Sequence, residues 1–160
     1  NILEPAVGIG KFFSLLPDKM QDSKLYGVEL DSLSGRIAKQ LYPNADIQIC
    51  GFEKANFSND FFDVAIGNIP FGQYGVNDPT YNKYHFLIHD YFVAKTLDKV
   101  RPGGIIILIT SKGTMDKQNT SVRQYIAARA ELLGAVRLPD TAFKKTANKD
   151  HVSPPLMMIG

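Results

Sequence analysis

The chain has 160 residues, of which 44% are hydrophobic and 11% aromatic, and it carries 18 basic against 16 acidic side chains. This size suits one domain with a hydrophobic core of its own, and the apolar content excludes a disordered chain. No apolar run approaches the roughly 20 residues that cross a bilayer, so a membrane protein is excluded.

Apolar runs and helical periodicity alternate along the chain. A strand at 1–4, closed by Pro5, precedes a helix at 11–16, and a strand at 25–30 precedes a helix that Asp31 or Ser32 caps. The apolar residues of that second helix recur four apart, at Leu33, Ile37 and Leu41. The elements expected after it are strands at 46–50 and 63–67, a helix at 84–100, a turn at 102–104, a strand at 105–109, a helix at 122–133 and a strand at 134–138.

Strands that alternate with helices predict an α/β fold with a doubly wound, mostly parallel sheet. The continuous apolar run at 105–109 is typical of a strand that is covered on both faces. In such folds ligands bind at the carboxyl ends of the strands. The segments that follow the strands are therefore the ones to search for chemistry.

Charge and cysteine content say less about function. Residues 1–80 carry 6 basic and 10 acidic side chains, and residues 81–160 carry 12 and 6. A polyanion that meets one side of the molecule explains this asymmetry, and scattered solvated lysines explain it equally well. The single cysteine, Cys50, excludes a disulfide framework and fits a reducing compartment. With no leader and no initiator Met, we expect a cytoplasmic piece of a longer protein.

Two glycines and an acid follow the first predicted strand. Glu4 stands at the strand's tip, and Gly8 and Gly10 allow a sharp turn and a close approach of the backbone to a ligand. Glu29 ends the second strand, near the spacing at which a carboxylate accepts hydrogen bonds from ribose hydroxyls. A plain strand-to-helix turn with a surface acid explains either feature alone. The two together favour an adenosine-type cofactor.

An amide, a proline and an aromatic ring follow the strand at 63–67. The Asn68 side-chain oxygen and the Ile69 carbonyl offer two acceptors for the hydrogens of an amino group, and Pro70 stiffens the loop. Phe71 offers a flat face for a planar base, a contact worth about 1–3 kcal/mol. These residues predict a pocket for a planar amine. The alternative is that Asn68 only opens a turn and that Phe71 packs in the core.

These motifs resemble those of a known family. Segment 4–10 resembles the cofactor motif of S-adenosylmethionine-dependent methyltransferases, and segment 68–71 resembles the catalytic Asn/Asp-Pro-Pro-Tyr/Phe motif of amino methyltransferases. Their order and spacing are similar to those of DNA adenine N-6 methyltransferases, above all the large bacterial methylases of phages and mobile elements, often fused to helicase-like regions. Further segments that look like this group are 84–86, 101–104, 110–116 and 133–139.

The resemblance implies a Rossmann-like methyltransferase fold and S-adenosyl-L-methionine as cofactor. It implies these cofactor-binding residues: Glu4, Ala6, Gly8, Gly10, Glu29, Leu30, Phe52 and Glu53. In this assignment Glu4 contacts the methionine part, Glu29 holds the ribose, Leu30 lies against the adenine, and Phe52 with Glu53 contacts the adenine edge.

The implied catalytic residues are Asn68, Ile69, Pro70 and Phe71. Asn68 and Ile69 grip the amino group of the target adenine, and Phe71 stacks on the flipped base. The family usually has a second proline where this chain has Ile69, but the acceptor needed there is a backbone carbonyl, which isoleucine also supplies. The implied partner is DNA, read by a target-recognition region or flanking domains that this chain lacks. The implied role lies in restriction-modification, and restriction, defence and plasmid maintenance all stay open.

The C-terminal region departs from the family. We expect the catalytic domain at 1–143 and a divergent tail at 144–160, because two adjacent prolines, Pro154 and Pro155, stand where the last strand belongs. The sheet is therefore expected to lack or alter that strand. The polar loop at 72–83 is expected to be mobile without DNA and to close over the target base.

Other readings of the site stay open. His85 and His89 have the spacing of a metal pair on a helix, but no further ligand completes a site, so we expect no metal. An RNA or protein-glutamine amino methyltransferase would use the same grip on a planar amine or amide. A degenerate, non-catalytic nucleic-acid-binding module is the third possibility.

Overall fold

The computed structural model describes residues 1–118, 120–139 and 155–159. Helical elements labelled α are α-helices and those labelled η are short 3-10 helices. In chain order the elements are β1 (Ile2–Glu4), η1 (Phe13–Leu15), η2 (Asp18–Met20), β2 (Leu25–Glu29), α1 (Ser32–Leu41), β3 (Asp46–Ile49), η3 (Phe52–Lys54), β4 (Phe62–Asn68), η4 (Asn82–Tyr84), α2 (Ile88–Lys99), β5 (Val100–Ser111), α3 (Gly113–Asp116), α4 (Ser121–Ala127), β6 (Gly134–Arg137) and β7 (Pro155–Ile159).

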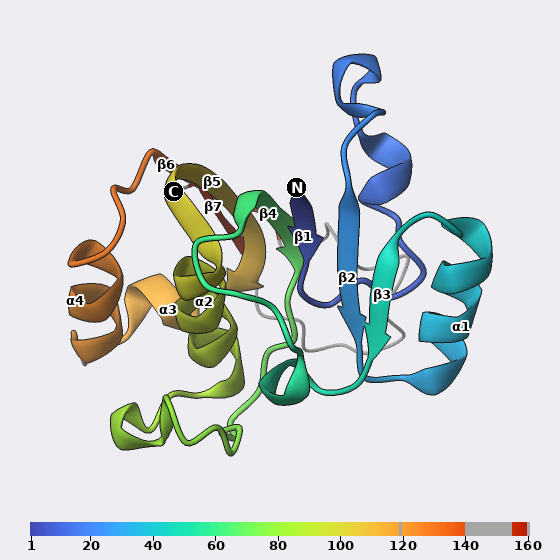
Figure 1. The fold of residues 1–160 in the computed structure, drawn as a ribbon. Coiled ribbons are helices and arrows are strands. Elements are labelled where there is room, and N and C mark those ends of the chain that lie inside the picture. Colours follow the sequence, from blue (N-terminus) through green and yellow to red (C-terminus); the bar gives the residue numbers. More distant parts are fainter. Residues whose placement is uncertain (119, 140–154, 160) are drawn as a thin grey trace.

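The strands of the described chain form one seven-stranded sheet in the order β3-β2-β1-β4-β5-β7-β6 (Figure 1). The pairings from β3 to β5 are parallel, and β7 runs antiparallel to both β5 and β6. The strands β2 and β3 follow β1 on one side of it, and the chain then crosses over to β4, which pairs with β1 on its other side. The switch point of the topology therefore lies between β1 and β4, where folds of this kind bind ligands. The predicted doubly wound fold is confirmed.

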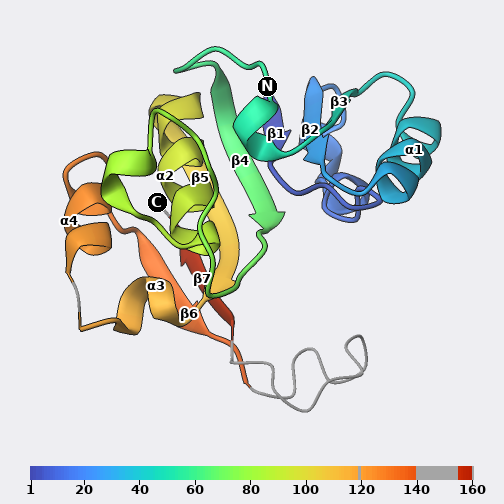
Figure 2. The ribbon, with the colours of Figure 1, turned by 90° about the horizontal axis from the view of Figure 1, so that it is seen from below.

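Buried hydrophobic residues lie on both faces of the sheet, as the two windings require. One cluster joins Val7 and Phe13 to Ala38 of α1 and Ile47 of β3. The larger cluster joins the inner strands to α2 and includes Leu3, Phe62, Ala65, Tyr91, Val93 and Leu108. Figure 2 shows α1 on one side of the sheet and α2, α3 and α4 on the other. Within the described residues, no helix combines the length and apolar content of a membrane span.

The expectation that the last strand is lost or altered is wrong. Pro155–Ile159 forms β7 between β5 and β6, with Ser111 opposite Pro155 and Ile107 opposite Ile159. Proline is tolerated as the first residue of a strand, so Pro155 opens β7 without disrupting its ladder. The proposed domain boundary after Phe143 lies outside the described residues and stays a prediction.

Several predicted boundaries differ from the structure. The turn expected at 102–104 lies inside β5, where Gly103 takes a φ of +75° and the register with β4 shifts, so the chain bulges rather than reverses. The helix expected from residue 84 begins at Ile88, and the helix expected at 122–133 ends at Ala127. The helix expected at 11–16 is only the short η1.

Apolar residues of α1 and β5 are more exposed to solvent than the sequence pattern predicts. Leu33, Ile37 and Leu41 of α1 are exposed, and the helix instead packs through Gly35 and Ala38. A Cβ on Gly35 would lie 2.9 Å from the Ile49 side chain, so the glycine lets α1 sit close to β3. Ile105 of β5 is also exposed, so this strand is covered less completely than expected by the described residues.

Candidate functional site

The segments that follow β1 and β4 leave the sheet side by side. Ile2 pairs with Val64 and Leu3 with Ala65, so the two parallel strands end at the same edge. A Cβ on Gly67 would lie 3.4 Å from Pro5 Cδ and 3.5 Å from Glu4 Cγ. The glycine turn and the segment at 68–71 therefore start as neighbours at the switch point.

Glu4 is a buried acid with a free acceptor. Its side chain is 2% exposed, and Oε2 has no hydrogen-bond partner among the described residues. Burial raises the pKa of Glu4 to about 9, and the nearby charge of Glu29 adds to the shift. The carboxyl group is therefore neutral at pH 7 until a ligand supplies positive charge or donors. Such an orphaned oxygen fits the ammonium and hydroxyl groups of S-adenosyl-L-methionine.

Glu29 ties the glycine turn to the start of α1. Its Oε2 accepts the backbone N–H of Gly8 at 2.7 Å, and its Oε1 accepts that of Asp31 at 2.7 Å. Each carboxylate oxygen can accept a second hydrogen bond, so ribose hydroxyls still find acceptors here. Gly8 has a φ of +54°, and open space lies where its Cβ would stand. Its backbone is therefore open to a ligand.

Gly10 has a different reason to be glycine. Its φ is +81°, and a Cβ there would come within 2.3 Å of the Tyr42 ring. The Tyr42 hydroxyl donates to the Gly10 carbonyl at 2.7 Å. The Tyr42 ring, which follows α1, thus occupies the space that a side chain at residue 10 would need. Glycine at this position lets the turn close.

The remaining predicted cofactor residues differ in how open they are. Leu30 is 77% exposed just after β2, and Ala6 is half-buried against the core. The Phe52 ring is buried 5.0 Å from that of Phe92, so only its backbone can meet a ligand. The Glu53 carboxylate folds over Gly51, where a Cβ would lie 2.3 Å from its oxygens.

The segment at 68–71 presents its amide and ring outward. Asn68 is the exposed last residue of β4, and its side chain has no hydrogen-bond partner among the described residues. Ile69 is buried and donates its N–H to the Ile109 carbonyl at 3.1 Å, which fixes the start of the loop, and Pro70 is half-buried. Phe71 is 47% exposed. The alternative in which Phe71 packs in the core is therefore excluded.

Residues 6–142 match the model of the Eco57I restriction-modification methylase family. The chain belongs to this family. The chain is also 34% identical over 163 residues to the "Defense against restriction protein B" of Escherichia phage P1, an alignment that covers 98% of this chain and 7% of the phage protein. The chain thus spans only a small part of that relative.

Solved structures show the same fold. A class I S-adenosylmethionine-dependent methyltransferase from Listeria monocytogenes superposes with a TM-score of 0.79 at 20% identity, over 99% of this chain and 52% of the other. A geranyl diphosphate methyltransferase in complex with S-adenosylmethionine gives a TM-score of 0.65 at 11% identity, over 99% and 76% of the two chains. The predicted fold agrees with these neighbours, and the predicted family agrees with the family match.

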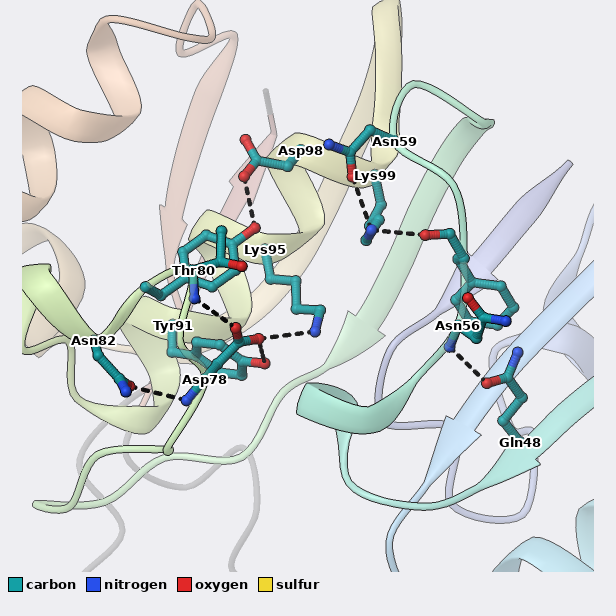
Figure 3. Close-up of polar contacts among 12 residues, drawn as sticks. Gln48, Asn56, Asn59, Asp78, Thr80, Asn82, Tyr91, Lys95, Asp98 and Lys99 are labelled. Carbon is teal, nitrogen blue, oxygen red and sulfur yellow. Dashed lines mark hydrogen bonds and ion pairs between the residues drawn. The ribbon is translucent and has the colours of Figure 1, made fainter.

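The loop between β4 and α2 is more firmly held than its polar sequence suggests. Asp78 is buried, and its Oδ2 accepts from the Tyr91 hydroxyl at 2.9 Å and from Lys95 Nζ at 3.0 Å (Figure 3). Burial favours the neutral acid, but the hydrogen bonds from Lys95 and Tyr91 outweigh it and hold the pKa of Asp78 below its usual range. Nearby, the Tyr81 hydroxyl donates to Asp98 at 2.6 Å.

Sequence reasoning missed this anchor. A Lys in the middle of an otherwise apolar helix face was the available signal, because a buried lysine needs a carboxylate partner. His85 and His89 also separate: His85 precedes α2 with a φ of +51°, whereas His89 is buried in its first turn. Among the described residues, no group of three or more His, Cys, Asp or Glu side chains could hold a metal ion.

Proposed function

We propose that this chain is the catalytic domain of an adenine-specific DNA methyltransferase. The observation that supports this most is the side-by-side exit of the Glu4 and Asn68 segments at the switch point, with Phe71 exposed beside them. A donor site and an acceptor site on neighbouring strands are what transfer between two bound molecules requires.

The acceptor grip comes from the end of β4. The Asn68 side-chain oxygen and the Ile69 carbonyl are suited to accept the two hydrogens of the adenine amino group. This nitrogen is a poor nucleophile because its lone pair is delocalised into the ring. Two acceptors favour a pyramidal nitrogen with a localised pair, and they stabilise the positive charge that develops on it during attack.

Phe71 is suited to hold the base outside the duplex. A base inside the stack cannot reach the site, and flipping it out costs a few kcal/mol. Stacking on an exposed aromatic ring contributes about 1–3 kcal/mol, which offsets part of that cost. The half-exposed ring of Phe71 is available for this contact without any change in the core.

The donor side uses Glu4, Glu29 and the open backbone at Gly8. Glu29 and Gly8 are suited to the ribose, and the buried Glu4 to the methionine part. S-adenosyl-L-methionine held by these residues would supply a sulfonium methyl group for transfer to the amine, and the proton that the amine releases would pass to water. The residues named here are suited to orient the two groups.

DNA and a separate target-recognition region are the proposed partners. The membership in a restriction-modification methylase family and the phage relative favour a role in modification carried by a mobile element, in the cytoplasm of a bacterial host. The acid-poor second half of the chain fits a polyanionic substrate.

The test is Asn68→Ala, assayed with radiolabelled S-adenosyl-L-methionine and DNA. We expect methyl transfer to be lost while S-adenosylhomocysteine binds as in the parent, because Asn68 lies on the acceptor side. Asn44→Ala, an exposed asparagine before β3, is the matched control and should leave both unchanged. Loss of binding together with transfer would contradict the assigned role.

The same assay separates the alternatives. Transfer to RNA or to a protein glutamine in place of DNA would favour those amino methyltransferases, since an Asn-x-Pro-Phe grip suits any planar amine or amide. Absence of S-adenosylhomocysteine binding by calorimetry would favour a non-catalytic nucleic-acid-binding module.

A further inference from the structure

A short turn at 111–117, which contains α3, follows β5 and lies directly beside the proposed acceptor loop. Asn68 pairs with Ile109 across the two strands, and Ile69 donates to the Ile109 carbonyl. Ser111 ends β5, so the turn at 111–117 emerges at the same edge of the sheet, next to the segment that holds Asn68 and Phe71. Any movement of this turn changes one border of the acceptor site.

This turn is fastened from several other elements. Lys117, at its end, forms an ion pair with Asp90 in the first turn of α2. Thr110 of β5 and Thr114 of the turn join their buried hydroxyls at 3.1 Å, and within the turn the Gly113 N–H donates to Ser111 Oγ at 3.2 Å. Arg123 of α4 donates to the Lys117 carbonyl. The turn is therefore held from two helices, α2 and α4, and from its own strand β5.

The Asp90–Lys117 contact is the only one of these that places an ion pair in the interior. The side chains of Asp90 and His89 are 1% and 2% exposed, and that of Lys117 is 27% exposed. Asp90 lies in the first turn of α2, near the positive end of the helix dipole. Lys117 Nζ also lies 3.4 Å from His89 Nε2, and burial holds the pKa of His89 below its ordinary value, so the ring is neutral at pH 7.

The cluster of Asp90, Lys117 and His89 lowers the stability of the folded protein. Asp90 Oδ1 and His89 Nδ1 have no hydrogen-bond partner among the described residues. Buried ion pairs contribute little net stability compared with apolar residues of the same volume, and orphaned buried polar atoms are unfavourable. What such a pair does supply is a fixed geometry: it holds the end of the turn at one place on α2.

We propose that Asp90 and Lys117 are a positioning pair that sets the turn at 111–117 against the acceptor loop, and so controls the acceptor side of the site without touching the cofactor side. The proposal rests on the methyltransferase function above. Neither residue contacts the reacting atoms. Their effect passes through β5 to Asn68, Ile69 and Phe71.

The test uses Asp90→Asn, which keeps the shape and removes the charge, and Lys117→Met and Lys117→Arg. We expect kcat for DNA methylation to fall by about 100-fold in Asp90→Asn and Lys117→Met, as for a misplacement of about 1 Å near a reacting group. The dissociation constant for S-adenosylhomocysteine should stay within about twofold of the parent value. Lys117→Arg should restore most of the activity, because it keeps the charge and a donor.

Arg101→Met is the matched control. Arg101 pairs with Asp63 at 2.7 Å on the same two strands, at the opposite edge of the sheet, so losing it should leave kcat unchanged. A general loss of stability would lower cofactor affinity as well as kcat. That result, or full activity in both charge-removing variants, would overturn the proposal.

A second measurement does not depend on turnover. Hydrogen exchange of the amides at 68–73 should be faster in Lys117→Met than in the parent, and as slow as the parent in Lys117→Arg. Unchanged exchange in Lys117→Met would also overturn the proposal. If Asn68→Ala keeps its activity, the proposed function fails. If Asn68→Ala is inactive while Asp90→Asn and Lys117→Met are active, only the positioning pair fails.

Discussion

The Glu29 carboxylate accepts the backbone N–H of Gly8 at 2.7 Å, a contact that joins the tip of β2 to the turn after β1. Its other oxygen accepts from Asp31, the N-cap of α1. One side chain therefore shapes both loops that border the proposed ribose site. A carboxylate in this place has a structural task before any cofactor arrives.

Replacing Glu29 by Gln should weaken cofactor binding. Glutamine can accept one of the two backbone hydrogen bonds through its oxygen, but its amide nitrogen cannot accept the other. Hydrogen bonds to a charged group are worth about 1.5–3 kcal/mol, so we expect a loss of about 10- to 100-fold in affinity for S-adenosylhomocysteine, measured by calorimetry. Glu131→Gln, at an exposed glutamate after α4, is the control and should bind normally.

The stability of the ligand-free protein should depend on Glu4. Its pKa is raised from 4.5 to about 9, so the folded state holds a proton that the unfolded state releases above pH 4.5. Stability should therefore fall as the pH rises between these two values, by about 1.4 kcal/mol per pH unit at most. Urea unfolding at several pH values measures this slope. Glu4→Gln, which cannot ionise, should flatten it, and an unchanged slope would contradict the assignment.

The two glycines of the first turn should respond differently to alanine. Gly8→Ala meets open space and carries only the strain of a φ of +54°, about 1–2 kcal/mol. Gly10→Ala carries similar strain and also forces a Cβ into the Tyr42 ring, which adds about 1–3 kcal/mol. Denaturant unfolding should rank Gly10→Ala as clearly less stable. Gly8→Ala should instead lose more cofactor affinity, because its backbone is the open one.

Phe71 should matter for substrate and little for folding. It is 47% exposed, so Phe71→Ala should leave the unfolding midpoint almost unchanged. If it stacks on the flipped base, the loss of about 1–3 kcal/mol should raise KM for DNA by about 5- to 150-fold. Phe71→Tyr keeps a flat ring and should keep KM. Equal effects of the two variants would argue against stacking.

The parallel arrangement followed from local pattern, and so did the proposed position of the site, because apolar runs between helices and glycines after strands carry direct signals. The face that α1 turns to the solvent could not be predicted from local pattern. Leu33, Ile37 and Leu41 have helical spacing, but the close packing of Gly35 against Ile49 turns that stripe outward. A periodic pattern identifies a helix and cannot tell which face its partners will cover.

The long-range partners were equally hidden. The role of Gly10 depends on Tyr42, and the fixed loop before α2 depends on Asp78 meeting Lys95, pairs that are far apart in the sequence. The strand at Pro155–Ile159 was missed because proline was weighed without its place in the strand. At the first position its missing N–H costs nothing.

The Asp78–Lys95 pair should make the largest single contribution to the stability of the loop before α2. Removing one partner leaves the other charge buried, so Lys95→Met and Asp78→Asn should each cost about 3–5 kcal/mol in the free energy of unfolding. Since the hydrogen bonds from Lys95 and Tyr91 outweigh burial and lower the pKa of Asp78, its contribution is present above the unfolded value of 3.8 and is lost as the pH falls through the folded value. Tyr91→Phe removes one neutral donor and should cost less. A double variant of Asp78 and Lys95 that is more stable than either single variant would show that the pair acts as a unit, whereas additive losses would mean that each residue acts through other contacts.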